Sequence, residues 1–273
     1  MDLWIFSPEL RSRGLFPDCL LALFLLIYCV MSGLIRTLHR KKLAKKPIPE
    51  EWLRILEEKI PFYRRLSGDL KERFLTDLKI FEAEKCFIAA GGMEITEEVR
   101  VIISACAVRI ILYLDISYYD RLTEIVVYPY VYRHQNEENA ILGEAQDWGT
   151  VVLSWPAILE GLAHPESGHE TAIHEFAHVL DRGEGPFNGT PKLRSRADYR
   201  PWAEIMSRHY LALRKHKRKE SRVLRAYGAT NEAEFFAVAT ESYFEKPRLM
   251  KQLIPDLYAE LQEFYGGDPA SNS

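Results

Sequence analysis

Cysteine is scarce in this 273-residue sequence, and its spacing indicates no chemistry. The four cysteines are Cys19, Cys29, Cys86 and Cys106, and no two of them form a C-x-x-C pair. Two of the four lie in an apolar segment near the N-terminus. This usage excludes both a disulfide framework and a thiolate metal site of the C-x-x-C type, and it favours a reducing compartment for the folded part.

An excess of positive charge is also missing. The net charge is −3, the pI is about 6.3, and 47% of the residues are hydrophobic. These are values of a globular protein, and they give the whole chain no tendency to bind nucleic acid. A dense basic run does occur within Arg208–Arg225, but no aromatic residue lies between Arg214 and Arg225. We interpret it as a solvated helix face; the alternative is contact with an anionic membrane surface.

A long uncharged segment extends from Cys19 to Ile35. With the flanking Leu15 and Phe16 it is long enough for a helix that spans a bilayer. Only Arg11 and Arg13 precede it, whereas a cluster of basic residues follows: Arg36, Arg40, Lys41, Lys42, Lys45 and Lys46. The positive-inside rule therefore predicts a single-pass anchor at 15–35 in the inner membrane, with the bulk of the chain in the cytoplasm.

Two alternatives to an anchor remain for this segment. A cleaved signal peptide carries its positive charge before the apolar run and a small-residue cleavage site after it. Here the charge follows the run, and no A-x-A site ends it. A buried helix of a soluble domain is the second alternative, although such helices are seldom apolar on every face.

The remaining chain predicts an α+β fold that is predominantly helical. Apolar residues recur at helical spacing from Trp52 to Phe87, with breaks at Pro61 and Gly68, and Thr96 begins another helix. Short strands are expected at K-C-F-I-A-A, at Ile125–Tyr132 and at Gly149–Trp155. The last of these is either an edge strand that can pair with an extended substrate or an ordinary core strand.

These patterns divide the chain into five parts. We expect an N-terminal tail at 1–14, the anchor at 15–35, a basic linker at 36–51, one domain at 52–265, and a disordered tail at 266–273. Within the domain, 52–120 is the helical part and 121–265 the catalytic part.

The segment Thr171–Asp181, TAIHEFAHVLD, contains an H-E-x-x-H motif. On a helix, His174 and His178 lie on one face, about 6 Å apart along the axis, so both imidazoles can bind one metal ion. Glu175 points to a neighbouring face, where it can deprotonate a metal-bound water. Burial of these side chains is costly unless something coordinates or pairs them. The alternative is a plain helix whose histidines are satisfied by hydrogen bonds.

A catalytic zinc site needs a third protein ligand and one open position. The segment Ala226–Phe244 can supply the ligand from a helix that Thr230 or Asn231 caps. Spacing alone does not choose among the acids Glu232, Glu234, Glu241 and Glu245, although Glu234 and Glu241 share a face. Asp181, one turn after His178, is a further candidate ligand, or a hydrogen-bond acceptor for a ligating histidine.

The block H-E-F-A-H-V-L-D, followed by N-E-A-E-F-F-A-V-A-T-E, resembles the Mlc titration factor A family of bacterial zinc metallopeptidases. Gly143–Trp155 resembles the strand that precedes the metal helix in that family, and the likeness covers roughly residues 52–255. The Y-G-A-T-N-E-A-E-F-F segment is also similar to the catalytic domain of anthrax lethal factor. Familiar members of the first family are soluble, so the N-terminal segment departs from its pattern.

The resemblance implies a zincin-like domain with a small sheet beside the metal-binding helix. It implies that Glu234 is the third zinc ligand and that Tyr227 donates a hydrogen bond to the developing oxyanion. Asp181 matches the aspartate that ends the family's metal motif.

Together these observations predict a membrane-anchored peptidase with one Zn²⁺ per chain, bound by His174, His178 and Glu234. Glu175 acts as the general base and Tyr227 assists. The expected partners are a peptide or protein substrate, the membrane and a protein regulator, but no nucleic acid. The alternative is a regulatory protein that sequesters a transcription factor or membrane partner, with a structural or vestigial zinc site and weak or vestigial peptidase activity. The intact Glu175 favours the enzyme, because a structural zinc site needs no base.

Overall fold

The computed structural model describes residues 31, 33–130, 149–165, 170–182 and 188–271. The chain divides into two units, Met1–Pro47 and Ile48–Ser273. In the described part of the first unit, residues 33–44 are helical, and Leu34, Ile35 and Leu38 are exposed. The expected linker at 36–51 is therefore partly wrong, because its first nine residues continue this helix and its last two begin the next one.

The predicted tail at 1–14 and most of the predicted anchor at 15–35 lie outside the described residues. Among the helices that the structure does describe, none combines the length and the apolar character needed to cross a bilayer.

The second unit contains a three-stranded parallel sheet in the order β1 (Cys86–Ala89), β2 (Glu124–Tyr128), β3 (Thr150–Ser154). All three strands were expected. The second ends at Tyr128 because Pro129, which has no N–H, cannot extend the ladder. Ile125 and Val127 of β2 are fully buried, whereas the alternate residues are half-buried, so one face of the sheet carries the core. Of the described strands, β3 is an edge strand and adjoins α7.

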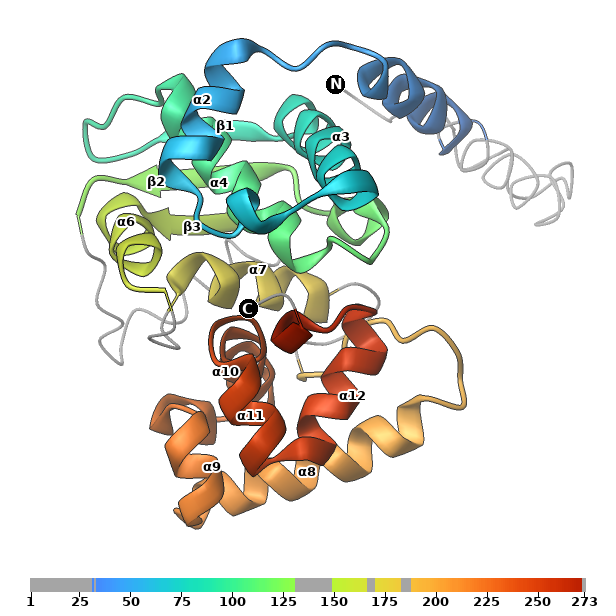
Figure 1. The fold of residues 1–273 in the computed structure, drawn as a ribbon, viewed down its shortest axis with the longest axis vertical. Helices are drawn as coiled ribbons and strands as arrows, with labels where there is room; N and C mark the ends of the chain where they lie inside the picture. Colours follow the sequence, from blue (N-terminus) through green and yellow to red (C-terminus); the bar gives the residue numbers. More distant parts are fainter. Residues whose placement is uncertain (1–30, 32, 131–148, 166–169, 183–187, 272–273) are drawn as a thin grey trace, which may run out of the picture. The chain divides into compact units, whose positions relative to one another are not determined.

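Helices α2 (Glu50–Lys59), α3 (Gly68–Glu84) and α4 (Glu97–Ile110) lie on one side of this sheet (Figure 1). Thr96 caps α4 by accepting a hydrogen bond from the N–H of Val99, as the sequence predicts. The central helix α4 is buried over most of its length and connects β1 to β2. Because α2 buries Trp52, Ile55 and Leu56, the folded unit begins slightly before the expected start at residue 52.

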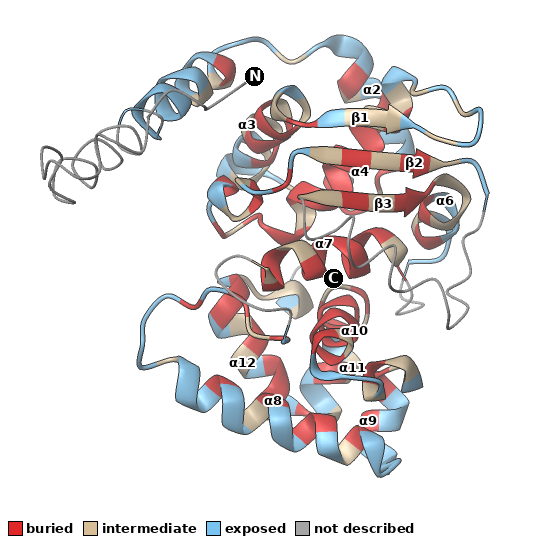
Figure 2. Ribbon diagram, turned by 180° about the vertical axis from the view of Figure 1, so that it is seen from behind, coloured by how far each residue is buried: buried red, intermediate tan, exposed pale blue. Residues whose placement is uncertain are grey.

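The strand β3 leads directly into α6 (Trp155–Ala163), and α7 (Thr171–Asp181) then passes beneath β3 (Figure 2). On the other side of α7 lie five further helices, which are α8 (Tyr199–Arg214), α9 (Arg218–Val223), α10 (Glu232–Glu245), α11 (Pro247–Leu253) and α12 (Pro255–Tyr265). Aromatic side chains join them, since Trp202 of α8 contacts Phe236 of α10 and Phe264 of α12. Helix α7 is therefore enclosed between the sheet layer and a helical layer.

The C-terminal segment differs from the expected disordered tail at 266–273. Gly266 ends α12 in the left-handed conformation, and a short 3₁₀ turn follows at Pro269–Ser271. The carboxylate of Asp268 accepts hydrogen bonds from the Tyr258 hydroxyl and from Lys251 Nζ, the latter at 2.8 Å. These contacts fix residues 266–271 on α11 and α12; composition alone does not reveal them because each partner is distant in the sequence.

Candidate metal centre

Helix α7 places His174, Glu175 and His178 in the interior. It packs against β3, α4 and α10, and each of the three polar residues is at most 6% exposed. The two imidazole rings are perpendicular, with centroids 4.7 Å apart, and their Nε2 atoms are separated by 3.2 Å. Residues four apart lie on the same face of a helix, so the spacing of His174 and His178 brings both imidazoles to one point.

Helix α10 brings Glu234 to the same point. The side chain of Asn231 accepts a hydrogen bond from the N–H of Glu234 at 2.9 Å, which fixes the first turn of the helix. The Oε2 atom of Glu234 lies 2.9 Å from Nε2 of His174 and 3.4 Å from Nε2 of His178. Within the described ranges these three residues form the group able to hold a metal ion.

The other acids that sequence spacing left open lie elsewhere. Glu232 is exposed at the start of α10, and Glu245, at its end, forms an ion pair with Arg109 at 2.8 Å. Glu241 lies on the far side of the His174 ring. Of these four acids, Glu234 is thus the one that lies beside Nε2 of both histidines.

The separations of the three ligand atoms fit a zinc ion. Zinc bound tetrahedrally with bonds of about 2.0–2.1 Å places neighbouring ligand atoms about 3.3 Å apart. In this site the three separations are 2.9, 3.2 and 3.4 Å. Two imidazoles and one carboxylate are also a donor set that zinc takes in hydrolytic enzymes, with one position left for water or substrate.

The electrostatics favour a positive charge between these atoms. Burial by itself lowers the pKa of His174, but hydrogen bonds with Glu234 and Glu241 outweigh it and raise that pKa to about 10. Burial likewise opposes ionisation of Glu234, yet hydrogen bonds with the two histidines hold its pKa well below the usual range. The buried carboxylates thus create a negative potential that a proton or a divalent cation can neutralise.

Glu241 orients the first histidine. Its Oε1 accepts a hydrogen bond from Nδ1 of His174 at 2.6 Å and a second one from the guanidinium of Arg225. A donor role for Nδ1 leaves the lone pair of Nε2 directed at the metal position. Sequence reasoning considered Glu241 only as a ligand and did not identify Arg225. The sequence does place Glu241 on the same helix face as Glu234, and this was the signal that could have identified it as a neighbour of the metal position.

Asp181 is not part of the group that could hold a metal ion, and among the described residues it accepts no hydrogen bond from a histidine. Its Oδ2 accepts a hydrogen bond from the backbone N–H of Gly189 at 2.8 Å. The carbonyl of Gly189 in turn accepts from Trp202 Nε1 at 3.2 Å. Because a Cβ at Gly189 would lie 2.3 Å from the carbonyl oxygen of Glu232, this hydrogen bond joins the end of α7 to a segment that lies against the start of α10.

Tyr227 and Glu175 border the same centre. Tyr227 belongs to a 3₁₀ turn, Ala226–Ala229, and its ring centroid is 5.8 Å from that of His174. Burial, the charges of Glu234 and Glu175 and a hydrogen bond with Glu234 all raise the pKa of Tyr227. The phenol is consequently a hydrogen-bond donor at neutral pH. Glu175 is close enough to act electrostatically on both His174 and Tyr227.

Comparison with known proteins agrees with this geometry. The sequence profile of the family described as glucose-regulated metallo-peptidase M90 matches residues 35–266. An uncharacterized protein of Synechocystis sp. is 35% identical over 86% of this chain and 90% of its own length. Mlc titration factor A of Edwardsiella ictaluri is 28% identical over 77% of this chain and 85% of its own. The protein of the same name from Yersinia pestis is 27% identical over 83% and 88%.

The family profile covers most of the chain, including both helices that contribute to the metal centre. The resemblance to Mlc titration factor A that the sequence motifs indicated is therefore confirmed. The chain belongs to the glucose-regulated metallo-peptidase M90 family.

Proposed function

We propose that this protein is a zinc-dependent peptidase in which His174, His178 and Glu234 bind the metal. The observation that carries the proposal is the meeting of these three side chains, from two helices, at separations that suit one zinc ion. Membership of a metallo-peptidase family supports it.

A zinc ion at this position would lower the pKa of a bound water and polarise the scissile carbonyl. The chain's own residues then perform the proton transfers. Glu175, next to His174, accepts the proton of the attacking water and returns it to the leaving amine. The Tyr227 hydroxyl, protonated because its pKa is raised, donates a hydrogen bond to the oxygen on which negative charge develops. Glu241 keeps His174 in the tautomer that leaves Nε2 free of a proton.

The test is hydrolysis of a peptide library by the purified full-length chain before and after removal of metal by a chelator. We expect activity that disappears with chelation and returns with stoichiometric zinc. Glu175→Gln should retain zinc and lose activity by about 10²–10⁴-fold. Wild-type turnover in that variant, or hydrolysis that is indifferent to chelation, would contradict the proposal.

A second candidate function is capture of a regulatory protein. The observation that favours it is the name of two relatives, Mlc titration factor A, which describes those proteins as titrating a partner. Binding and peptidase activity are compatible in one chain. Partner capture that persists after chelation, in a protein that hydrolyses no member of the library, would make binding the main function.

We also propose, from the sequence alone, that residues 15–35 anchor the protein in the inner membrane with the metal centre in the cytoplasm. The basic residues after Ile35 support this orientation. Fractionation of cells that express the full chain, with protease added to intact and to lysed spheroplasts, tests it. Release of the protein into the soluble fraction, or cleavage of its C-terminal part in intact spheroplasts, would overturn it.

A further inference from the structure

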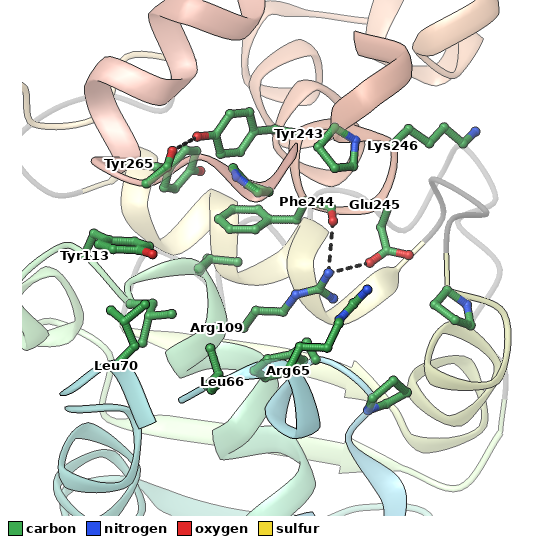
Figure 3. A pocket seen from close by; sticks show the side chains of 18 of the residues that line it. Arg65, Leu66, Leu70, Arg109, Tyr113, Tyr243, Phe244, Glu245, Lys246 and Tyr265 are labelled. Atoms are coloured by element: carbon green, nitrogen blue, oxygen red, sulfur yellow. Dashed lines mark hydrogen bonds and ion pairs between the residues drawn. The ribbon is translucent and has the colours of Figure 1, made fainter. Parts of the chain in front are cut away.

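A cavity of about 770 Å³ opens between the 3₁₀ turn η2 (Tyr63–Arg65), the end of α4 and the junction of α10 with α11 (Figure 3). None of the three metal-holding residues is among the residues that line it. It is therefore a feature separate from the metal centre, and the proposed peptidase mechanism makes no use of it.

Apolar and aromatic side chains form much of its wall, and they include Phe62, Leu66, Leu70, Tyr113, Phe244 and Tyr265. Figure 3 shows Leu66, Leu70 and Tyr113 on one side, with Phe244 and Tyr265 facing them. A wall of this kind binds the apolar part of a ligand, because such side chains gain by removal from water.

The charges of the lining are strongly unbalanced. Five of its side chains are cationic (Arg64, Arg65, Arg109, Lys246 and Arg248), whereas Glu245 is its single carboxylate. That carboxylate is already engaged, because Arg109 binds it at 2.8 Å and binds Glu170 at 2.7 Å. The lining side chains therefore include four more cations than carboxylates.

Arg65 is the cation best placed to meet a ligand. The residue is exposed, and its guanidinium makes no ion pair or hydrogen bond with another described residue, in contrast to that of Arg64, which donates to the carbonyl of Glu57 at 2.9 Å. In Figure 3 the side chains of Arg65 and Arg109 extend toward the same part of the cavity, beside Glu245. A guanidinium at this position can bind a carboxylate or phosphate through two parallel hydrogen bonds.

The lining combines an apolar wall with cationic side chains, and a ligand that suits only one of these parts leaves the other unused. An inorganic anion would leave the apolar wall in contact with water, and a neutral apolar molecule would leave the arginine without a partner. We propose that the cavity binds a small amphipathic anion, with a carboxylate or phosphate monoester at Arg65 and an aliphatic or aromatic body against Leu66, Tyr113 and Phe244.

The experiment is isothermal titration of the full-length, zinc-loaded protein with octanoate and octyl phosphate, below their micelle concentrations. Octan-1-ol tests the apolar body alone, and acetate and inorganic phosphate test the charge alone. We expect at least one octyl anion to bind at least about tenfold more tightly than all three controls. Octan-1-ol lacks the charged hydrogen bond, and acetate and inorganic phosphate lack the apolar body that the wall removes from water. The tighter of the two anions then assigns the head group.

The variant is Arg65→Gln, at an exposed position that should not affect folding. It should weaken binding of the octyl anion about tenfold and leave octan-1-ol unchanged. Lys219→Gln, which removes an exposed charge from α9, is the matched control and should have no effect. Failure of both anions to bind, equal binding of octan-1-ol, or binding that is unchanged in Arg65→Gln would each overturn the proposal. Unchanged binding in Arg65→Gln would also be the result if the anions bound at the metal centre, which does not contain Arg65.

Discussion

The Nδ1 atom of His174 lies 2.6 Å from Oε1 of Glu241, although 67 residues separate them in the chain. Glu241 is fully buried, and its second hydrogen-bond partner is the guanidinium of Arg225. The carboxylate therefore lies between an imidazole and a guanidinium and binds both through the same oxygen. Glu241 and Arg225 therefore help to position His174, one of the three residues that could hold a metal ion.

Replacement of Glu241 should weaken metal binding without removing a ligand. Glu241→Gln takes away the charged acceptor of His174, and loss of such a partner typically lowers zinc affinity about 10–100-fold. Competition with a chromophoric chelator measures the change. Glu232→Gln, an exposed position on the same helix, is the control and should bind zinc as the wild type does. Equal affinity in the two variants would show that Glu241 has only a packing role.

Loss of the Tyr227 hydroxyl should affect the reaction and not the binding of metal or substrate. The raised pKa of Tyr227 keeps it protonated, so it can donate a hydrogen bond as charge develops. Tyr227→Phe is expected to lower kcat by about 10²-fold, with zinc content and KM nearly unchanged. Steady-state kinetics on one cleaved peptide tests this, with Tyr130→Phe at a half-exposed site as control. An increase confined to KM would instead make Tyr227 a substrate-binding residue.

The stability of the protein should fall as pH rises through the titration of Glu170. Burial raises the pKa of this carboxyl from 4.5 to about 7; Arg109 opposes the shift and Glu245 adds to it. Because the folded pKa is raised, the stabilising contribution of the neutral carboxyl is complete below about pH 4.5 and is lost as pH rises through about 7.

Glu170→Gln should remove this part of the pH dependence. Urea unfolding of metal-free protein at pH 5 and pH 8 gives the free energy of unfolding at each pH. We expect the wild type to lose on the order of 2 kcal/mol more than the variant between these values. Removal of metal beforehand keeps zinc release from contributing. Identical losses in the two proteins would contradict the shift.

Gly189 should tolerate no side chain. Its φ is +75°, and a Cβ there would lie 2.3 Å from the carbonyl oxygen of Glu232. Gly92 has a similar φ of +79°, but a Cβ at that position meets nothing within 4 Å. Gly92→Ala should therefore cost only the left-handed strain of about 1–2 kcal/mol, whereas Gly189→Ala should cost more because the backbone of α10 must also move. Urea unfolding compares the two, and equal costs would argue against close contact at Gly189.

The local elements of the fold were predictable because their signals are local. The Thr96 cap, the helical spacing after Trp52 and the strand before Pro156 each depend on residues within a few positions of one another, and all three appear as expected. The segment after Gly266 was misjudged because its order comes from Lys251 and Tyr258, which the composition of the tail does not contain. The linker was predicted to begin at residue 36, but the helix continues to residue 44. The basic residues at 36–44 indicate that this segment is exposed to solvent, and they do not indicate where the helix ends.

By itself, the sequence determined that two imidazoles and a glutamate would share one helix, since H-E-x-x-H spacing matches the helical period. It also determined that a second helix would carry several carboxylates and begin at Thr230 or Asn231, of which the structure shows Asn231 as the cap. Residue spacing left open which carboxylate meets both histidines, and the family resemblance pointed to Glu234. The tertiary structure brings Glu234 to both rings, because the choice among Glu232, Glu234 and Glu241 depends on how α10 packs against α7. The same packing made Glu241 the partner of His174, made Asp181 an anchor for Gly189, and produced the cavity beside Arg65.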